Sequence, residues 1–179
     1  MVAAVNVFSR QQLDIGSRFL LDQAPHWPAS RTVLDLGCGN GVLGLVAMDA
    51  PQVKPESVVF VDESRLALQS ARRNSEQLKG DSSAKCHYLH SDGLLDYPDS
   101  LPAPDLVLCN PPFHQGHVVD DWIGRRLIAQ CAARLCRGGE LWLVANRHLP
   151  YGESLARGFA SVEQMARNNK FIIYRAVGK

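Results

Sequence analysis

The sequence has no long hydrophobic run, no internal repeat and no low-complexity tract. No apolar stretch approaches the roughly 18 residues that a membrane-spanning helix needs, so we expect no membrane partner. The first residues lack the basic start and long apolar core of a secretory signal, so we expect a cytoplasmic protein. With 46% hydrophobic and 21% charged residues in 179 positions, the composition is that of a globular domain with a full core.

The cysteines also lack a recognisable pattern. There are five of them, an odd number, and no two are in C-x-x-C spacing. Cys131 and Cys136 are five positions apart, so they would not share one face of a helix. This pattern is typical neither of a disulfide framework nor of a zinc site, so we expect five reduced thiols and no metal.

The net charge of only +1 conceals a gradient along the chain. Residues 1–121 contain nine Lys and Arg against fifteen Asp and Glu, whereas residues 122–179 contain ten against three. Asymmetry of this kind indicates a polyanionic partner such as nucleic acid. Any single basic side chain fits a solvated helix face equally well, so only the set supports the prediction.

Predicted strands and helices alternate along the chain. We expect strands at 32–35, 57–61, 86–90, 106–109, 140–145, 162–165 and 171–177, and helices at 13–21, 42–50, 64–78, 122–135 and 151–159. The alternation predicts a doubly wound α/β domain with a mostly parallel sheet and helices on both faces. Asn168-Asn169 is typical of a hairpin turn between the last two strands.

A glycine-rich turn, Gly37-Cys38-Gly39-Asn40-Gly41, lies between the first predicted strand and the next helix. Glycine permits tight turns and close approach of the backbone to a ligand. The turn loosely matches a dinucleotide fingerprint, which alone is a weak signal. Asp35, just before it, would repel a diphosphate and suits a cationic group such as the ammonium of a methionine moiety.

Two further carboxylates end the next two strands. Asp62, followed by Glu63, ends the second strand, where a carboxylate can accept both hydroxyls of a ribose. Asp92, followed by Gly93, comes after the third strand and could accept a hydrogen bond from an adenine amino group. Each Asp alone is as typical of a helix cap or turn. With the glycine turn and Asp35, the set predicts S-adenosylmethionine, a cation that carries a ribose and an adenine.

The segment Asn110-Pro111-Pro112-Phe113 follows the predicted buried strand at 106–109. Ligands bind at this end of the strands in an open α/β sheet. Pro111 has no N–H and a fixed φ, and Pro112 favours an extended conformation for it. The segment therefore offers the Asn110 side-chain oxygen and the Pro111 carbonyl as acceptors, beside the flat face of Phe113. Such a set suits a substrate with a planar amine.

These motifs resemble those of known enzymes. The order of the Asp35–Gly41 turn, Asp62 and Asn110-Pro-Pro-Phe is similar to that in class I S-adenosylmethionine-dependent methyltransferases that act on amines. Three segments narrow the resemblance to the bacterial ribosomal RNA guanine-N2 methyltransferases: residues 7–17, 110–114 and 144–149. Three further segments are most similar to the members that act on the large (23S) subunit RNA, with the small-subunit (16S) members next: residues 59–64, 145–149 and 168–171.

The resemblance implies a Rossmann-like class I fold with a seven-stranded, mostly parallel sheet that has one antiparallel strand. It implies methylation of the N2 amine of a guanine in ribosomal RNA, with S-adenosylmethionine as the cofactor. The expected cofactor-binding residues are Phe8, Ser9, Asp35, Gly37, Cys38, Gly39, Asn40, Gly41, Asp62, Glu63, Asp92, Gly93 and Asn110. The expected catalytic residues are Asn110, Pro111, Pro112 and Phe113, and the expected substrate contacts are Phe113, His114, Arg147 and His148.

Members of that family carry a degenerate methyltransferase-like domain ahead of the catalytic one. We therefore expect residues 1–30 to form an N-terminal extension with an edge helix, residues 31–179 to form the methyltransferase domain, and the chain to be the C-terminal half of a longer protein. Two other classes stay open. One is methylation of another planar amine, adenine N6 or a protein glutamine, by enzymes that more often have Tyr where Phe113 stands. The other is a non-catalytic RNA-binding module.

Overall fold

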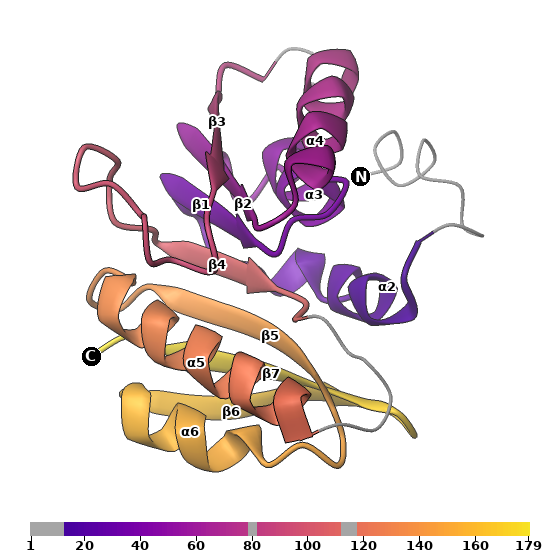
Figure 1. The fold of residues 1–179 in the computed structure, drawn as a ribbon, viewed down its shortest axis with the longest axis vertical. Coiled ribbons are helices and arrows are strands. Elements are labelled where there is room, and N and C mark those ends of the chain that lie inside the picture. The colour runs from indigo at the N-terminus through magenta and orange to yellow at the C-terminus, as the bar shows by residue number, and fades with distance from the viewer. Residues whose placement is uncertain (1–12, 79–81, 112–117) are drawn as a thin grey trace.

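The chain folds into one sheet between two layers of helices (Figure 1). The structure is a computed structural model that describes residues 13–78, 82–111 and 118–179, without the side chains of 118–121. The helices are α2 (Ile15–Leu21), the 3-10 turn η1 (Ala24–His26), α3 (Val42–Asp49), α4 (Arg65–Leu78), α5 (Val118–Arg134) and α6 (Tyr151–Gly158). The strands are β1 (Thr32–Leu36), β2 (Ser57–Asp62), β3 (Lys85–His90), β4 (Leu106–Cys109), β5 (Glu140–Asn146), β6 (Ser161–Arg167) and β7 (Phe171–Val177). No helix within the described ranges has the length and apolar character to cross a membrane.

The sheet has the strand order β3-β2-β1-β4-β5-β7-β6. The neighbours from β3 to β5 are parallel, whereas β7 runs antiparallel to both β5 and β6. One strand of seven is therefore antiparallel, which confirms the predicted fold class. The largest boundary difference is at α5, which begins at Val118 rather than at residue 122.

Each face of the sheet contributes to a separate hydrophobic core, because side chains alternate along a strand. The helices α2, α3 and α4 pack on one face, over side chains that include Phe60 and Trp142. The helices α5 and α6 pack on the other face, where Tyr151 is fully buried. The central strands β1 and β4 are buried along their whole length, which is why they appear in the sequence as short apolar runs.

The order of the strands reverses at β1, which pairs with β2 on one side and with β4 on the other. Leu36 and Cys109, the last residues of β1 and β4, are directly opposite each other in the register. The turn after β1 and the segment after β4 therefore begin side by side. Ligands of doubly wound folds bind at such a switch point, at the carboxyl ends of the strands.

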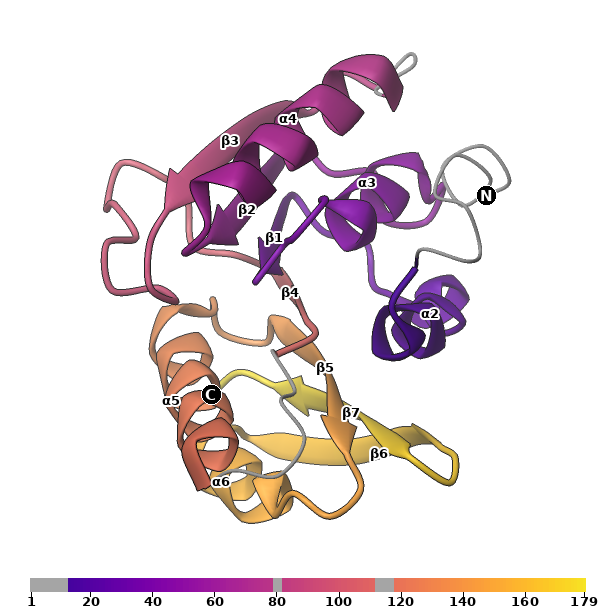
Figure 2. The same cartoon turned by 45° about the vertical axis from the view of Figure 1, so that its right-hand side comes forward.

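The hairpin of β6 and β7 brings a second group of residues to the same edge of the sheet. Asn146, the last residue of β5, pairs with Phe171, the first residue of β7. The predicted turn at Asn168 is confirmed, because the Asn168 side chain accepts hydrogen bonds from the amides of Lys170 and Phe171 at 2.8 and 2.7 Å. Both views place α2 and this turn on the same side of the molecule (Figures 1 and 2).

Candidate active site

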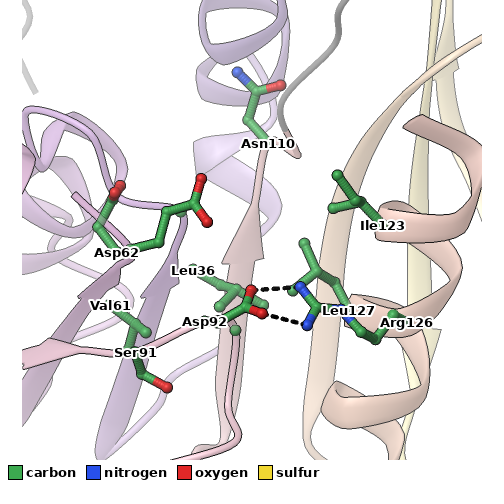
Figure 3. Close-up of a pocket in the computed structure, with 12 residues that line it drawn as sticks. Leu36, Val61, Asp62, Ser91, Asp92, Asn110, Ile123, Arg126 and Leu127 are labelled. Carbon is green, nitrogen blue, oxygen red and sulfur yellow. Dashed lines mark hydrogen bonds and ion pairs between the residues drawn. The ribbon is translucent and has the colours of Figure 1, made fainter. Parts of the chain in front are cut away.

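Two cavities lie at the carboxyl edge of the sheet, and Gly37 and Asn110 belong to the walls of both. The first, of about 210 Å³, is called the carboxylate cavity (Figure 3); its lining is Leu36, Gly37, Val61, Asp62, Glu63, Ser91, Asp92, Gly93, Asn110, Ile123, Arg126 and Leu127. The second, of about 360 Å³, is called the loop cavity; its lining is Leu13, Asp14, Ser17, Gly37, Cys38, Gly39, Asn40, Val42, Leu43 and Asn110. An elongated ligand that occupies both would pass Asn110 at its middle.

The glycine turn is held by main-chain hydrogen bonds. The amides of Gly37 and Cys38 both donate to the carbonyl of Val61 at 2.9 Å, which ties the turn to the end of β2. Gly37 and Gly41 have φ of +69° and +82°, values that favour glycine. A Cβ at Gly41 would also lie 3.0 Å from the Cβ of Ala71. Gly41 can therefore lie this close to α4 only because it has no side chain.

Asp62 connects the glycine turn to the start of α4. Its Oδ2 accepts a hydrogen bond from the Gly39 amide at 2.9 Å, and its Oδ1 accepts one from the Ser64 amide at 2.8 Å. Each carboxylate oxygen has further lone pairs, and the side chain lines the carboxylate cavity. Asp62 is therefore held in one orientation, with acceptor capacity left for a ligand's hydroxyls.

Asp92 faces the same cavity, but its carboxylate is paired with an arginine side chain. The guanidinium of Arg126, on α5, donates to both carboxylate oxygens, at 2.5 Å from Nη1 to Oδ2 and by a short bond from Nη2 to Oδ1. Figure 3 shows this pair on the α5 side of the cavity, with Asp62 on the opposite side. The hydrogen bonds from Arg126 lower the pKa of Asp92. The Asp92 carboxylate, which we predict to contact an adenine, is thus held in place by a residue of helix α5.

Asp35 is fully buried and belongs to the lining of neither cavity. Its Oδ2 accepts a hydrogen bond from the Gly44 amide at 2.8 Å, and its Oδ1 has no partner among the described residues. Burial raises the pKa of Asp35 from 3.8 to about 8, with a smaller contribution from the negative charge of Asp62. A direct contact between Asp35 and a cationic group of a ligand stays a prediction.

Asn110 follows the last residue of β4, and its carboxamide has one orientation. Its Nδ2 donates to Asp14 Oδ2 at 2.7 Å and to Ser17 Oγ at 2.8 Å. Because a carboxylate can only accept hydrogen bonds from it, the atom facing Asp14 must be the nitrogen. Asn110 Oδ1 is left buried and without a partner among the described residues. The nitrogen and oxygen of this side chain point to different sides in Figure 3.

The predicted substrate residues Arg147 and His148 follow β5 at the same edge, and both are exposed. The amide of Arg147 donates to the carbonyl of Lys170 at 2.9 Å, so the end of β5 adjoins the β6–β7 turn. Five predicted site residues fall outside the described part of the chain: Phe8, Ser9, Pro112, Phe113 and His114.

The comparison with protein families settles the class of this fold. The family described as methyltransferase small domain matches residues 1–175, nearly the whole chain. The chain belongs to this methyltransferase family.

Individual relatives agree with the methyltransferase assignment. The chain is 47% identical to ribosomal RNA large subunit methyltransferase G of Ectopseudomonas mendocina, over 98% of the chain and 46% of the relative. It is 45% identical to the protein of that name from Aeromonas salmonicida, over 96% and 44%. The chain thus spans about half the length of the curated relatives it matches.

Solved methyltransferase structures show the same fold. The T. thermophilus 16S rRNA N2 G1207 methyltransferase, in complex with AdoMet and guanosine, superimposes with a TM-score of 0.78 at 27% identity, over 96% of this chain and 45% of that one. The ribosomal protein L11 methylase of Lactobacillus delbrueckii superimposes with a TM-score of 0.67 at 19% identity, over 92% and 78%. The second likeness concerns the fold alone.

Three residues of this candidate site were not predicted from the sequence: Asp14, Ser17 and Arg126. Arg126 lies on α5 with Ile123 and Leu127, at the spacing of one helix face, and all three line the carboxylate cavity. Asp14 and Ser17 have the spacing of a helix cap, which explains their local role but does not reveal a partner 96 residues away. The five cysteines, all within the described residues, form no disulfide in the structure.

Proposed function

We propose that this chain transfers a methyl group from S-adenosylmethionine to the exocyclic N2 amine of a guanine in ribosomal RNA of the large subunit, in the cytoplasm. The observation that carries the proposal is the state of Asn110. This residue lines both cavities, its nitrogen donates to Asp14 and Ser17, and its oxygen has no partner among the described residues. The 47% identity to a large-subunit enzyme supports the choice of RNA.

The two cavities fit the parts of S-adenosylmethionine. The carboxylate cavity offers Asp62 for the ribose hydroxyls and Asp92 for the adenine amine. The loop cavity offers the main chain of the glycine turn to the methionine portion. Asn110 adjoins both, which is where the sulfonium would lie. When bound, S-adenosylmethionine supplies an electrophilic methyl group.

The protein's part in the chemistry is to present the amine. The lone pair of a guanine amine is delocalised into the ring, so the amine is a poor nucleophile. If Asn110 Oδ1 and the Pro111 carbonyl each accept one N–H, the nitrogen is drawn towards a tetrahedral shape and its lone pair becomes available. Positioning and oriented hydrogen bonds are therefore the main contributions. No strong general base is needed before transfer, because the methylated nitrogen readily loses its extra proton to water afterwards. Phe113 would hold the base by stacking, worth roughly 1–3 kcal/mol.

The RNA would lie along the carboxyl edge of the sheet. Arg147 and His148 at the end of β5 are exposed there, and Arg167 and Lys170 flank the adjoining β6–β7 turn. These four residues, called the edge cluster, offer phosphate contacts that position the RNA without reading its sequence. The target guanine must lie in a loop or be flipped from its stack to reach Asn110.

The test is to incubate the chain with radiolabelled S-adenosylmethionine and ribosomal RNA from cells that lack methylation, and then to digest the RNA to nucleosides. We expect label in N2-methylguanosine from the 23S RNA. Labelled N2-methylguanosine from the 16S RNA would mean that the small-subunit RNA is the substrate. Labelled N6-methyladenosine would mean that the methylated base is adenine. Absence of label from RNA, with S-adenosylmethionine bound and a glutamine-containing protein labelled instead, would overturn the proposal.

A further inference from the structure

We propose that Asp14 and Ser17 are positioning residues that orient the Asn110 carboxamide so that its oxygen, and not its nitrogen, meets the methyl-accepting amine. The inference rests on the proposed function, since it assigns a role to residues that act through Asn110. Neither Asp14 nor Ser17 needs to touch the reacting atoms to perform it.

The first part of the argument is hydrogen-bond chemistry. A carboxamide can turn over about its last torsion, which exchanges an acceptor for two donors at nearly the same position. Towards an amine, the wrong orientation would place N–H groups against N–H groups. In the structure both Nδ2 hydrogens of Asn110 are used, one on the Asp14 carboxylate and one on the Ser17 hydroxyl. Turning the amide over would break both bonds and set Oδ1 against a carboxylate.

The second part is packing around the carboxamide. Asp14 is the N-cap of α2, and its Oδ2 accepts from the Ser17 amide at 2.9 Å as well as from Asn110. Between them lies Gly16, where a Cβ would be 3.0 Å from both Asn110 Oδ1 and Asp14 Oδ2. The start of α2 therefore packs closely against the Asn110 side chain. This side chain fits there because Gly16 has no side chain of its own. Among the described residues Oδ1 has no partner, so it is the atom of this amide that we expect to meet another molecule.

Variants at position 14 separate helix capping from amide orientation. Asp14→Ser keeps a good N-cap for α2, but its short side chain does not reach Asn110. Asp14→Asn is the conservative control, because one amide oxygen can replace Oδ2 as the acceptor for both Ser17 and Asn110. For Asp14→Ser we expect the single-turnover rate at saturating S-adenosylmethionine to fall ~10–100-fold, with the cofactor Kd within a few-fold of wild type. Asp14→Asn should restore most of the rate, and Ser17→Ala should resemble Asp14→Ser.

A second measurement does not depend on turnover. The side-chain amide protons of Asn110, identified by NMR through their loss in Asn110→Ala, should exchange slowly with solvent in wild type and in Asp14→Asn. In Asp14→Ser we expect at least about tenfold faster exchange of one of them, since an unpartnered amide proton is open to water. In an Asn110→Ala background, Asp14→Ser should not lower the methylation rate further.

The outcomes distinguish this inference from the proposed function. If wild type labels no guanine, the proposed function fails, and the exchange measurement still decides whether Asp14 and Ser17 hold the amide. If wild type is active and Asp14→Ser matches it in rate and in exchange, the positioning role is wrong. A weaker cofactor Kd with an unchanged rate would overturn it too, because Asp14 would then be a cofactor contact.

Discussion

The guanidinium of Arg126 on α5 binds both carboxylate oxygens of Asp92, at the end of β3, across the wall of the carboxylate cavity. The pair fixes the carboxylate in one orientation and leaves its remaining lone pairs for a ligand. We expect Asp92→Ala to weaken S-adenosylmethionine binding several-fold, by roughly 1 kcal/mol for one hydrogen bond. The measurement is calorimetric titration. Asp99→Ala is the control, because Asp99 also forms an ion pair with an arginine of α5, here a single contact with Arg134, outside both cavities.

Asp62 should contribute more to cofactor affinity than Asp92. It holds the Gly39 amide as well as facing the cavity, so its loss loosens the glycine turn and removes the ribose acceptor. We expect Asp62→Ala to weaken S-adenosylmethionine binding by roughly 1–3 kcal/mol. Asp105 is a fair comparison, since its Oδ2 accepts the amides of Arg31 and Thr32 away from the cavities. If Asp62→Ala and Asp105→Ala have equal cofactor affinities, a residue other than Asp62 must contact the ribose.

Asn110 should matter for turnover and little for affinity. Asn110→Ala removes the acceptor for the amine and leaves Asp62, Asp92 and the glycine turn in place, so we expect a cofactor Kd within a few-fold of wild type. Single-turnover methylation should fall by at least about 100-fold, the usual effect of losing one oriented catalytic hydrogen bond. Asn146→Ala, at the tip of the neighbouring strand β5, is the control. A wild-type rate in Asn110→Ala would refute the mechanism.

Asp35 gives the stability of the fold a pH dependence. Its pKa is 3.8 ordinarily and about 8 in the folded protein, so between these values the folded state holds a proton that the unfolded chain has released. The contribution of Asp35 to the free energy of unfolding therefore falls as the pH rises from about 4 to about 8. We expect Asp35→Asn to be more stable than wild type at pH 8, with a smaller difference at pH 5. Urea unfolding at both pH values, without cofactor, checks this. A gap that is constant with pH would mean that the buried carboxyl ionises normally.

The edge cluster should set the salt dependence of RNA binding. Each basic side chain that meets a phosphate adds to the steepness with which affinity falls with salt, by about 0.7 in slope for a single strand. We expect the double variant Arg147→Ala/Lys170→Ala to weaken RNA binding and to flatten that slope by roughly 1–2. Arg137→Ala/Arg157→Ala removes the same charge from the opposite, amino edge of the sheet. Equal slopes in the two double variants would argue against the edge cluster as the RNA surface.

The strands and their tips could be predicted from the sequence because their signals are local. Buried apolar runs identify β1, β2 and β4, and parallel strands of a doubly wound sheet end at one edge, so Asp62 and Asn110 could both be assigned to the ligand-binding edge. Contacts from outside those strands could not be predicted. The pair Arg126–Asp92 depends on which face of α5 meets the sheet, and the bond from Asn110 to Asp14 spans 96 residues.

Only the structure shows which basic side chains of residues 122–179 are in ion pairs and at which edge of the sheet they lie. Arg134 and Arg175 are engaged in ion pairs, with Asp99 and with Glu140 and Glu163. Because β7 runs antiparallel, Arg175 pairs with Trp142 near the start of β5, and its side chain reaches Glu140, the first residue of β5, at the edge opposite the cavities. Lys170, only five residues earlier, lies at the edge that carries the site. A count of charges along the chain does not distinguish these two edges.

The hydrogen bond from Asn110 to Asp14 connects the end of β4 to the start of the short helix α2. The orientation of the Asn110 amide therefore depends on α2 staying in place. The seven residues of α2 are too few to be stable as an isolated helix, so tertiary packing keeps the helix in place. A local opening of this element would release the Asn110 amide while the seven-stranded sheet stayed folded. If the chain has the proposed activity, its loss on heating or in denaturant would then precede global unfolding, and the docking of α2 would set the temperature range of methylation.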